Sequence, residues 1–125
     1  MRRIVILTIL AALPLSLAIA GGPQAARAAA QDGNWSVLVI TEKGTCDRGY
    51  RYNVKVADGR VVYQGDAAVS LNGTVEPNGL VKVSIKGGDK DASGTGHLSA
   101  NAGAGTWRGG GSAGACAGSW EAERR

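Results

Sequence analysis

Residues 69–86 have the sequence VSLNGTVEPNGLVKVSIK, in which two runs of alternating apolar and polar side chains flank a short turn. Alternation with a period of two is typical of a strand that has one buried face and one solvated face. The segment Pro77-Asn78-Gly79 between the two runs is typical of a tight turn. The stretch therefore predicts an antiparallel hairpin.

The same pattern recurs on both sides of this hairpin. Further segments with alternation or a short apolar run are residues 35–40, 50–56, 61–63, 93–100, 105–107 and 116–122. Turn signals separate them, with Asp58-Gly59 before the hairpin and a turn over Lys86–Asp91 after it. No segment after Trp35 shows a convincing helical period. The chain therefore predicts an all-β fold, an antiparallel up-and-down meander of about eight short strands.

Three Gly-x-Trp motifs indicate how this meander closes. They are Gly33-Asn34-Trp35, Gly105-Thr106-Trp107 and Gly118-Ser119-Trp120. Residues two apart on a strand share a face, so each glycine lies on the same side as its tryptophan. Inward glycines let a strand bend sharply, and a neighbouring aromatic ring can cover the backbone that they expose. We therefore predict a small barrel, closed or nearly closed, with the indole rings in its core.

Residues 1–30 have the three-part layout of a secretory signal peptide. Met1-Arg2-Arg3 is positively charged, residues 4–20 are predominantly apolar, and small residues allow cleavage near residue 30. Removal of this leader leaves no membrane span and a single β-barrel domain over residues 31–125. The pattern predicts a protein that is exported to the periplasm or secreted.

The net charge of +4 comes mostly from this leader. Residues 31–125 carry 11 basic and 10 acidic side chains, which leaves a net charge near +1. A near-neutral domain lacks the electrostatic footprint of a protein that binds a phosphate backbone. The composition therefore argues against a nucleic-acid partner. We expect the mature domain to be a monomer.

Cys46 and Cys116 are the two cysteines of the chain, and an oxidising compartment allows them to form a disulfide. In an eight-stranded meander the end of the first strand lies near the start of the last, where these two residues fall. A disulfide there would join the two edges of the sheet and fasten the barrel. Such a link over about 70 residues stabilises a fold by about 4 kcal/mol in the chain-entropy model.

The titratable residues do not converge on a catalytic set. His97 falls on the polar face of its strand, and Ser112 lies in a G-x-S-x-G match without the strand and helix that a nucleophile elbow needs. Asp89-Lys90-Asp91 supplies too few oxygen ligands for calcium and is typical of a solvated turn. The sequence therefore predicts a protein that is not an enzyme and that has no catalytic residues, metal site or cofactor.

Gly33-Asn34-Trp35 near the start of the first strand, combined with an arginine at the end of the last, resembles the calycin pattern of lipocalins and avidins. This resemblance implies that Arg124 or Arg125 packs across Trp35 where the barrel closes, in a cation–π contact worth about 0.5 to 2 kcal/mol. The chain also resembles small exported alphaproteobacterial proteins of unknown function, which implies export and carries over no catalytic residue. The segments of this second likeness are residues 35–39, 44–48 and 116–120.

These features favour an exported, non-enzymatic binding module that uses its loops or the mouth of the barrel. The sequence leaves three candidate partners for this module: a small apolar molecule, a glycan, and an envelope or extracellular protein. Two candidate recognition surfaces are the segment Lys43–Tyr50, which holds Cys46, and the glycine-rich segment Gly109–Gly114. The alternative is a structural or adhesive component of the cell surface whose strand edges pair with other chains. An interior filled with side chains would exclude the small-molecule form.

Overall fold

The computed structural model describes residues 29–125, so the predicted signal peptide over residues 1–30 lies almost entirely outside the described part of the chain. A short 3₁₀ helix precedes eight strands. The elements are η1 (Ala29–Gln31), β1 (Gly33–Lys43), β2 (Gly49–Ala57), β3 (Arg60–Tyr63), β4 (Ser70–Val75), β5 (Leu80–Gly87), β6 (Lys90–Leu98), β7 (Ala102–Gly111) and β8 (Gly114–Arg124).

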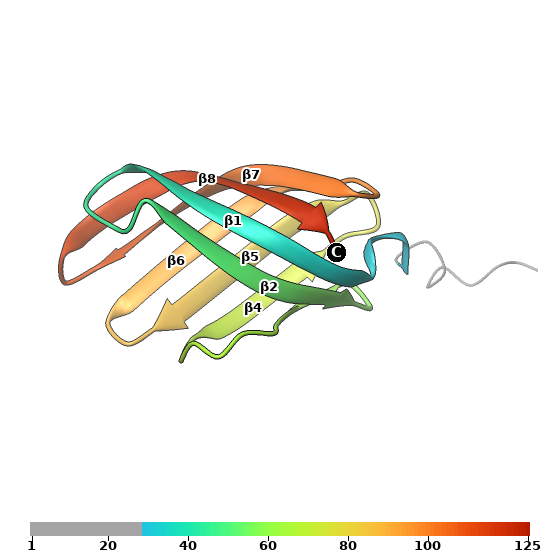
Figure 1. Ribbon diagram of the computed structural model, residues 1–125, viewed down its shortest axis with the longest axis horizontal. Helices are drawn as coiled ribbons and strands as arrows, with labels where there is room; N and C mark the ends of the chain where they lie inside the picture. The colour runs from blue at the N-terminus through green and yellow to red at the C-terminus, as the bar shows by residue number, and fades with distance from the viewer. Residues whose placement is uncertain (1–28) are drawn as a thin grey trace, which may run out of the picture.

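The eight strands form a closed antiparallel barrel in chain order (Figure 1). Each strand pairs with its sequence neighbours, and β1 also pairs with β8, where Trp35 lies opposite Arg124. This arrangement confirms the all-β meander and its closure. Within residues 29–125 there is no helix with the length and apolar character that a membrane-spanning helix requires.

The turns follow from the residues that the sequence places there. Asp58 and Gly59 both have positive φ angles, 52° and 75°, which is the backbone geometry of a two-residue hairpin turn. The turn predicted over Lys86–Asp91 is shorter than expected, since β5 continues to Gly87 and β6 begins at Lys90. Gly88, with a φ of 60°, allows a two-residue connection, and Lys90 therefore belongs to a strand.

The packed core occupies one end of the barrel, which we call the closed end. Its buried members come from the first residues of β1 and β5 and from the second halves of β2, β4, β6 and β8. An up-and-down meander brings these parts of the strands to the same end. The buried members are Trp35, Val54, Val56, Val75, Val81, Leu98, Trp120 and Ala122. The opposite end, which we call the open end, carries the β1–β2, β3–β4, β5–β6 and β7–β8 connections.

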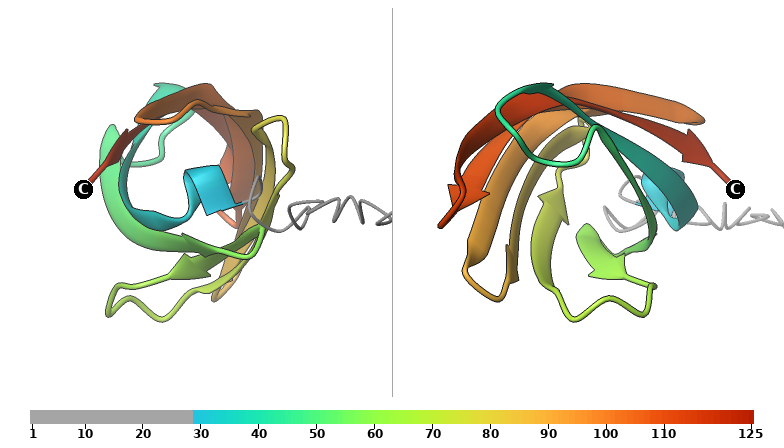
Figure 2. Two further views of the ribbon diagram at one scale, coloured as in Figure 1. Left: turned by 90° about the vertical axis from the view of Figure 1, so that its right-hand side faces the viewer. Right: turned by 60° about the vertical axis from the view of Figure 1, so that its left-hand side comes forward.

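Arg124 fastens the closed end. Its guanidinium carbon lies 4.7 Å from the centroid of the Trp35 ring. Its three nitrogens donate hydrogen bonds to the carbonyl oxygens of Ala30, Asp32 and Ala100. The Trp35 indole N–H in turn donates to the carbonyl of Gln31 at 2.9 Å, so η1 lies across this end of the barrel (Figure 2). Of the two arginines that the sequence offered, Arg124 makes the contact.

The Trp120 ring covers glycine backbone on β6 and β7. A Cβ atom at Gly105 would lie 2.6 Å from the ring, and a Cβ atom at Gly96 would meet the same ring. The indole N–H of Trp120 donates to the carbonyl of Thr95 at 3.1 Å. This arrangement confirms the expectation at Gly105. At the other two motif glycines a Cβ atom would meet Arg124, beside Gly33, or the backbone of Ile40, beside Gly118.

The wall of the barrel is thinnest between β3 and β4. These strands share two register pairs, whereas β1 and β2 share eight. The four residues of β3 end before the open end is reached, and residues 64–69 continue as a loop beside the opening (Figure 2). The Tyr63 hydroxyl accepts a hydrogen bond from the amide of Ala67 at 3.1 Å and anchors this loop.

Candidate ligand cavity

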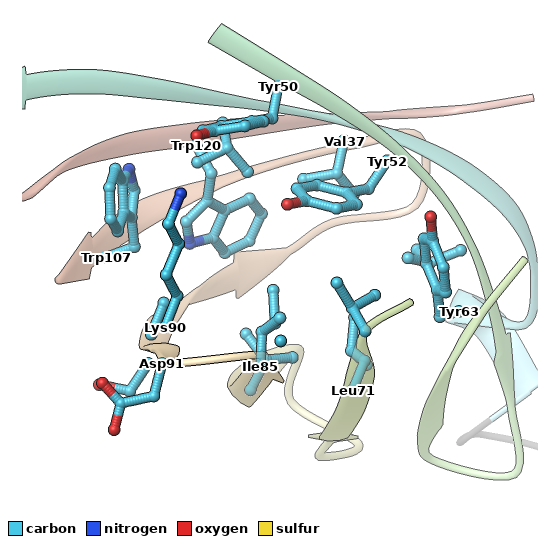
Figure 3. Close-up of a pocket in the computed structure, with 18 of the residues that line it drawn as sticks. Val37, Tyr50, Tyr52, Tyr63, Leu71, Ile85, Lys90, Asp91, Trp107 and Trp120 are labelled. Carbon is cyan, nitrogen blue, oxygen red and sulfur yellow. The ribbon is translucent and has the colours of Figure 1, made fainter. Parts of the chain in front are cut away.

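The barrel is hollow between its core and its open end. The cavity has a volume of about 600 Å³, which lies in the range of small-molecule sites. The core residues form its floor, and inward side chains from all eight strands line it (Figure 3). The principal wall residues are Val37, Val39, Tyr50, Tyr52, Tyr63, Leu71, Val83, Ile85, Trp107 and Trp120.

The cavity exists because β6 and β7 contribute little side-chain volume near the open end. Ala92 of β6 lies opposite Gly109 of β7, and both face inward. No phenylalanine is present anywhere in the chain to fill the space from another strand. The interior therefore stays open in this part of the barrel.

Three tyrosines line one side of the cavity. The rings of Tyr50 and Tyr52 stack with centroids 6.2 Å apart, and Tyr63 meets Tyr52 edge to face at 5.9 Å. Burial raises the pKa of Tyr52 above its ordinary value of 10.0, and the neighbouring hydroxyls of Tyr50 and Tyr63 raise it further. Tyr52 therefore offers a neutral hydroxyl that can donate or accept a hydrogen bond inside an otherwise apolar wall.

The raised pKa of Tyr52 predicts a loss of stability in alkaline solution. The unfolded tyrosine ionises at about pH 10, while the folded one still holds its proton. Its contribution to folding is therefore fully present below about pH 10 and is lost as the pH rises through the raised folded pKa. Urea unfolding at a series of pH values between about 8 and 11 measures this loss, which should be smaller in Tyr52→Phe. An equal loss in both proteins would contradict the assignment.

The two loops proposed from the sequence as recognition surfaces meet at the mouth of this cavity. The disulfide between Cys46 and Cys116, with Cα atoms 6.1 Å apart, joins the β1–β2 loop to the start of β8. Parts of both segments, Lys43–Tyr50 and Gly109–Gly114, border the cavity. The disulfide confirms the predicted pairing and is consistent with an oxidising compartment such as the periplasm or the extracellular space.

A further polar contact links two connections at the open end. The Asp89 carboxylate accepts hydrogen bonds from the hydroxyl and the amide of Ser112. These bonds lower the pKa of Asp89, the hydroxyl contributing most. Ser112 is thereby engaged in holding the β5–β6 turn against the β7–β8 turn.

The structure separates the other residues that the sequence singled out for chemistry. His97 is exposed near the end of β6 toward the closed end, whereas Ser112 lies in the β7–β8 turn at the open end. Asp91 borders the cavity with its carboxylate directed outward, and Lys90 extends across the mouth (Figure 3). Within residues 29–125 no group of three or more His, Cys, Asp or Glu side chains is placed to hold a metal ion.

Sequence reasoning did not identify the cavity or the tyrosine cluster. Alternation places Tyr50 and Tyr52 on an inward face, but it does not distinguish a wall residue from a core residue. Comparison of the chain with protein-family models, curated proteins and solved structures found no match, so the chemistry of the cavity itself is the guide to its function.

Proposed function

We propose that the protein is an exported, non-enzymatic binding module that holds a small, mostly apolar molecule in the open half of its barrel. The observation that carries this proposal is the cavity of about 600 Å³ with aliphatic and aromatic walls. Wall side chains that face an empty space lose dispersion contacts, and a bound molecule restores them. Each Å² of apolar ligand surface removed from water adds about 25 cal/mol of driving force.

The polar groups of the cavity suit a ligand that is apolar over most of its surface. Tyrosine hydroxyls are few and project from aromatic rings, so they orient a ligand without solvating all of it. A glycan, whose surface carries hydroxyls on every side, would leave many of them unpaired against Val37, Leu71 and Ile85. The small apolar molecule is therefore the best supported of the partners that the sequence left open.

The structural or adhesive alternative depends on strand edges that are available to other chains. Each of the strands β1–β8 pairs with a neighbour on both sides within the closed barrel. Closure removes the long free edges that drive association between sheets. This observation favours the binding module over the alternative.

Filling the cavity should weaken binding without unfolding the barrel. Ile85 points into the cavity (Figure 3), so in Ile85→Trp the larger ring occupies space that the ligand needs. The neutral apolar fluorophore N-phenyl-1-naphthylamine is a suitable probe, titrated by its fluorescence. We expect its affinity to fall by at least about tenfold, equivalent to about 1.4 kcal/mol.

Ser84→Trp is the matched control for this experiment. Ser84 precedes Ile85 on the same strand and is exposed on the outer face, so the same ring is added outside the barrel. Its affinity for the probe should equal that of the unmodified protein. Equal affinities in all three proteins would place the bound probe elsewhere, and failure of the unmodified protein to bind would contradict the proposed function.

A further inference from the structure

The inward face of the barrel carries two charged residues among the strand positions of residues 29–125, and they lie at opposite ends. Arg124 faces inward at the closed end, where Trp35 and three backbone carbonyls satisfy its guanidinium. Lys90 begins β6 at the open end and lies on the same face as Ala92 and the buried Gly94. The other inward strand positions hold apolar, glycine, threonine or tyrosine side chains.

The Lys90 side chain extends over the mouth of the cavity, toward the side that carries Tyr50 and Trp107 (Figure 3). Its four-carbon stem can cover apolar surface while the ammonium group stays in contact with water. The Asp89 carboxylate is hydrogen-bonded to Ser112, and the charge of Lys90 is the smallest of the causes that lower its pKa. Asp91 borders the cavity, but its carboxylate is directed outward. A positive charge is therefore held at the boundary between an apolar cavity and solvent.

This placement gives the cavity two chemically different zones. The deep zone is apolar, with Val37, Leu71 and Ile85 in its wall. The outer zone has the ammonium group of Lys90. This compact charge has three hydrogen-bond donors on a flexible stem, so it can bind anionic groups of various shapes. Asp47 in the β1–β2 loop is the remaining acidic residue that borders the mouth, and it lies outside the inward strand face.

We propose that the ligand is an amphiphilic carboxylate, a molecule with an apolar body and one anionic end. The body lies in the deep zone, and the carboxylate remains at the mouth, where the Lys90 ammonium pairs with it. This inference rests on the proposed function and adds the chemical class of the ligand. Because the ion pair is partly solvated, we expect the charge of Lys90 to strengthen binding by about fivefold to tenfold.

The test compares two probes that differ at the carboxyl end alone, the anionic 11-(dansylamino)undecanoic acid and its neutral methyl ester. Lys90→Met keeps most of the apolar stem and removes the ammonium group. The acid should bind the unmodified protein more tightly than the ester does. In Lys90→Met the affinity for the acid should fall about fivefold to tenfold, while the affinity for the ester stays unchanged.

Two further variants control for charge and for packing. Lys82→Met removes the same charge from the exposed outer face of β5 and should leave both affinities unchanged. Lys90→Arg retains the positive charge and should retain the preference for the acid. An equal loss in Lys82→Met and Lys90→Met would overturn the inference, because the effect would then come from net charge alone.

The two probes also separate this inference from the proposed function on which it rests. If the ester binds the unmodified protein and the acid binds no better, the cavity is a site for apolar molecules and the role of Lys90 is overturned. If the unmodified protein binds neither probe, the proposed function is contradicted together with the inference.

Discussion

Replacing both cysteines in Cys46→Ala/Cys116→Ala should lower the free energy of unfolding by about 4 kcal/mol. The disulfide joins residues that are 70 positions apart, so its loss frees most of the chain in the unfolded state. The link also lies at the open end, where a cavity replaces packed side chains. A loss of this size is a large fraction of the total stability of a typical small domain.

Urea unfolding of the double variant measures this effect. Alanine is the appropriate replacement because Cys116 is buried, and a serine hydroxyl there would add a desolvation cost of its own. The unmodified protein with its disulfide reduced should show a similar loss. A change of less than about 1 kcal/mol in both experiments would show that packing and strand pairing suffice to hold the barrel.

Trp35→Ala should destabilise the protein by about 3 to 5 kcal/mol, the usual cost of deleting a large buried aromatic side chain. Trp35 is 1% exposed and lies at the centre of the closed end. The substitution removes its packing against the core, its hydrogen bond to Gln31 and the ring that Arg124 covers. Thermal or urea unfolding followed by circular dichroism measures the loss.

Trp107→Ala is the matched comparison, since it deletes the same side chain from the cavity wall. Trp107 is only half-buried and faces the hollow part of the barrel, so its removal should cost clearly less. If Trp35→Ala does not fold, Trp35→Phe can be measured in its place. It keeps a ring in the core and loses the hydrogen bond to Gln31, which should lower the free energy of unfolding by about 1 kcal/mol. Equal losses at positions 35 and 107 would contradict the division of the barrel into a packed end and a hollow end.

Much of the fold could be predicted from local sequence signals. Alternation fixes which side chains of a strand face inward, and Asp58-Gly59 fixes a hairpin, because both depend on neighbouring residues alone. Closure through Cys46 and Cys116 followed from the geometry of a meander with an even number of strands. The position of Arg124 over Trp35 agrees with what the calycin-like pattern implied.

The cavity could not be predicted in the same way, because alternation specifies a direction and not a depth. Trp35 and Trp107 occupy equivalent Gly-x-Trp motifs, yet the first is in the core and the second borders the hollow. The surroundings of these two tryptophans differ because the other strands place more side-chain volume at the closed end of the barrel than at the open end. The sequence pattern places Lys90 in a solvated turn. The two-residue Gly88-Asp89 connection shows instead that Lys90 begins a strand and faces inward.

The uneven wall of the barrel determines where the closed sheet opens most readily. Chain ends usually loosen first, but β1 and β8 share eight register pairs and are fastened by the disulfide at one end and by Arg124 at the other. The two register pairs between β3 and β4 form the weaker seam, in the middle of the sequence. We therefore expect thermal motion to open the wall first beside Tyr63, because the free energy of this local opening is lower than that of the better paired seams.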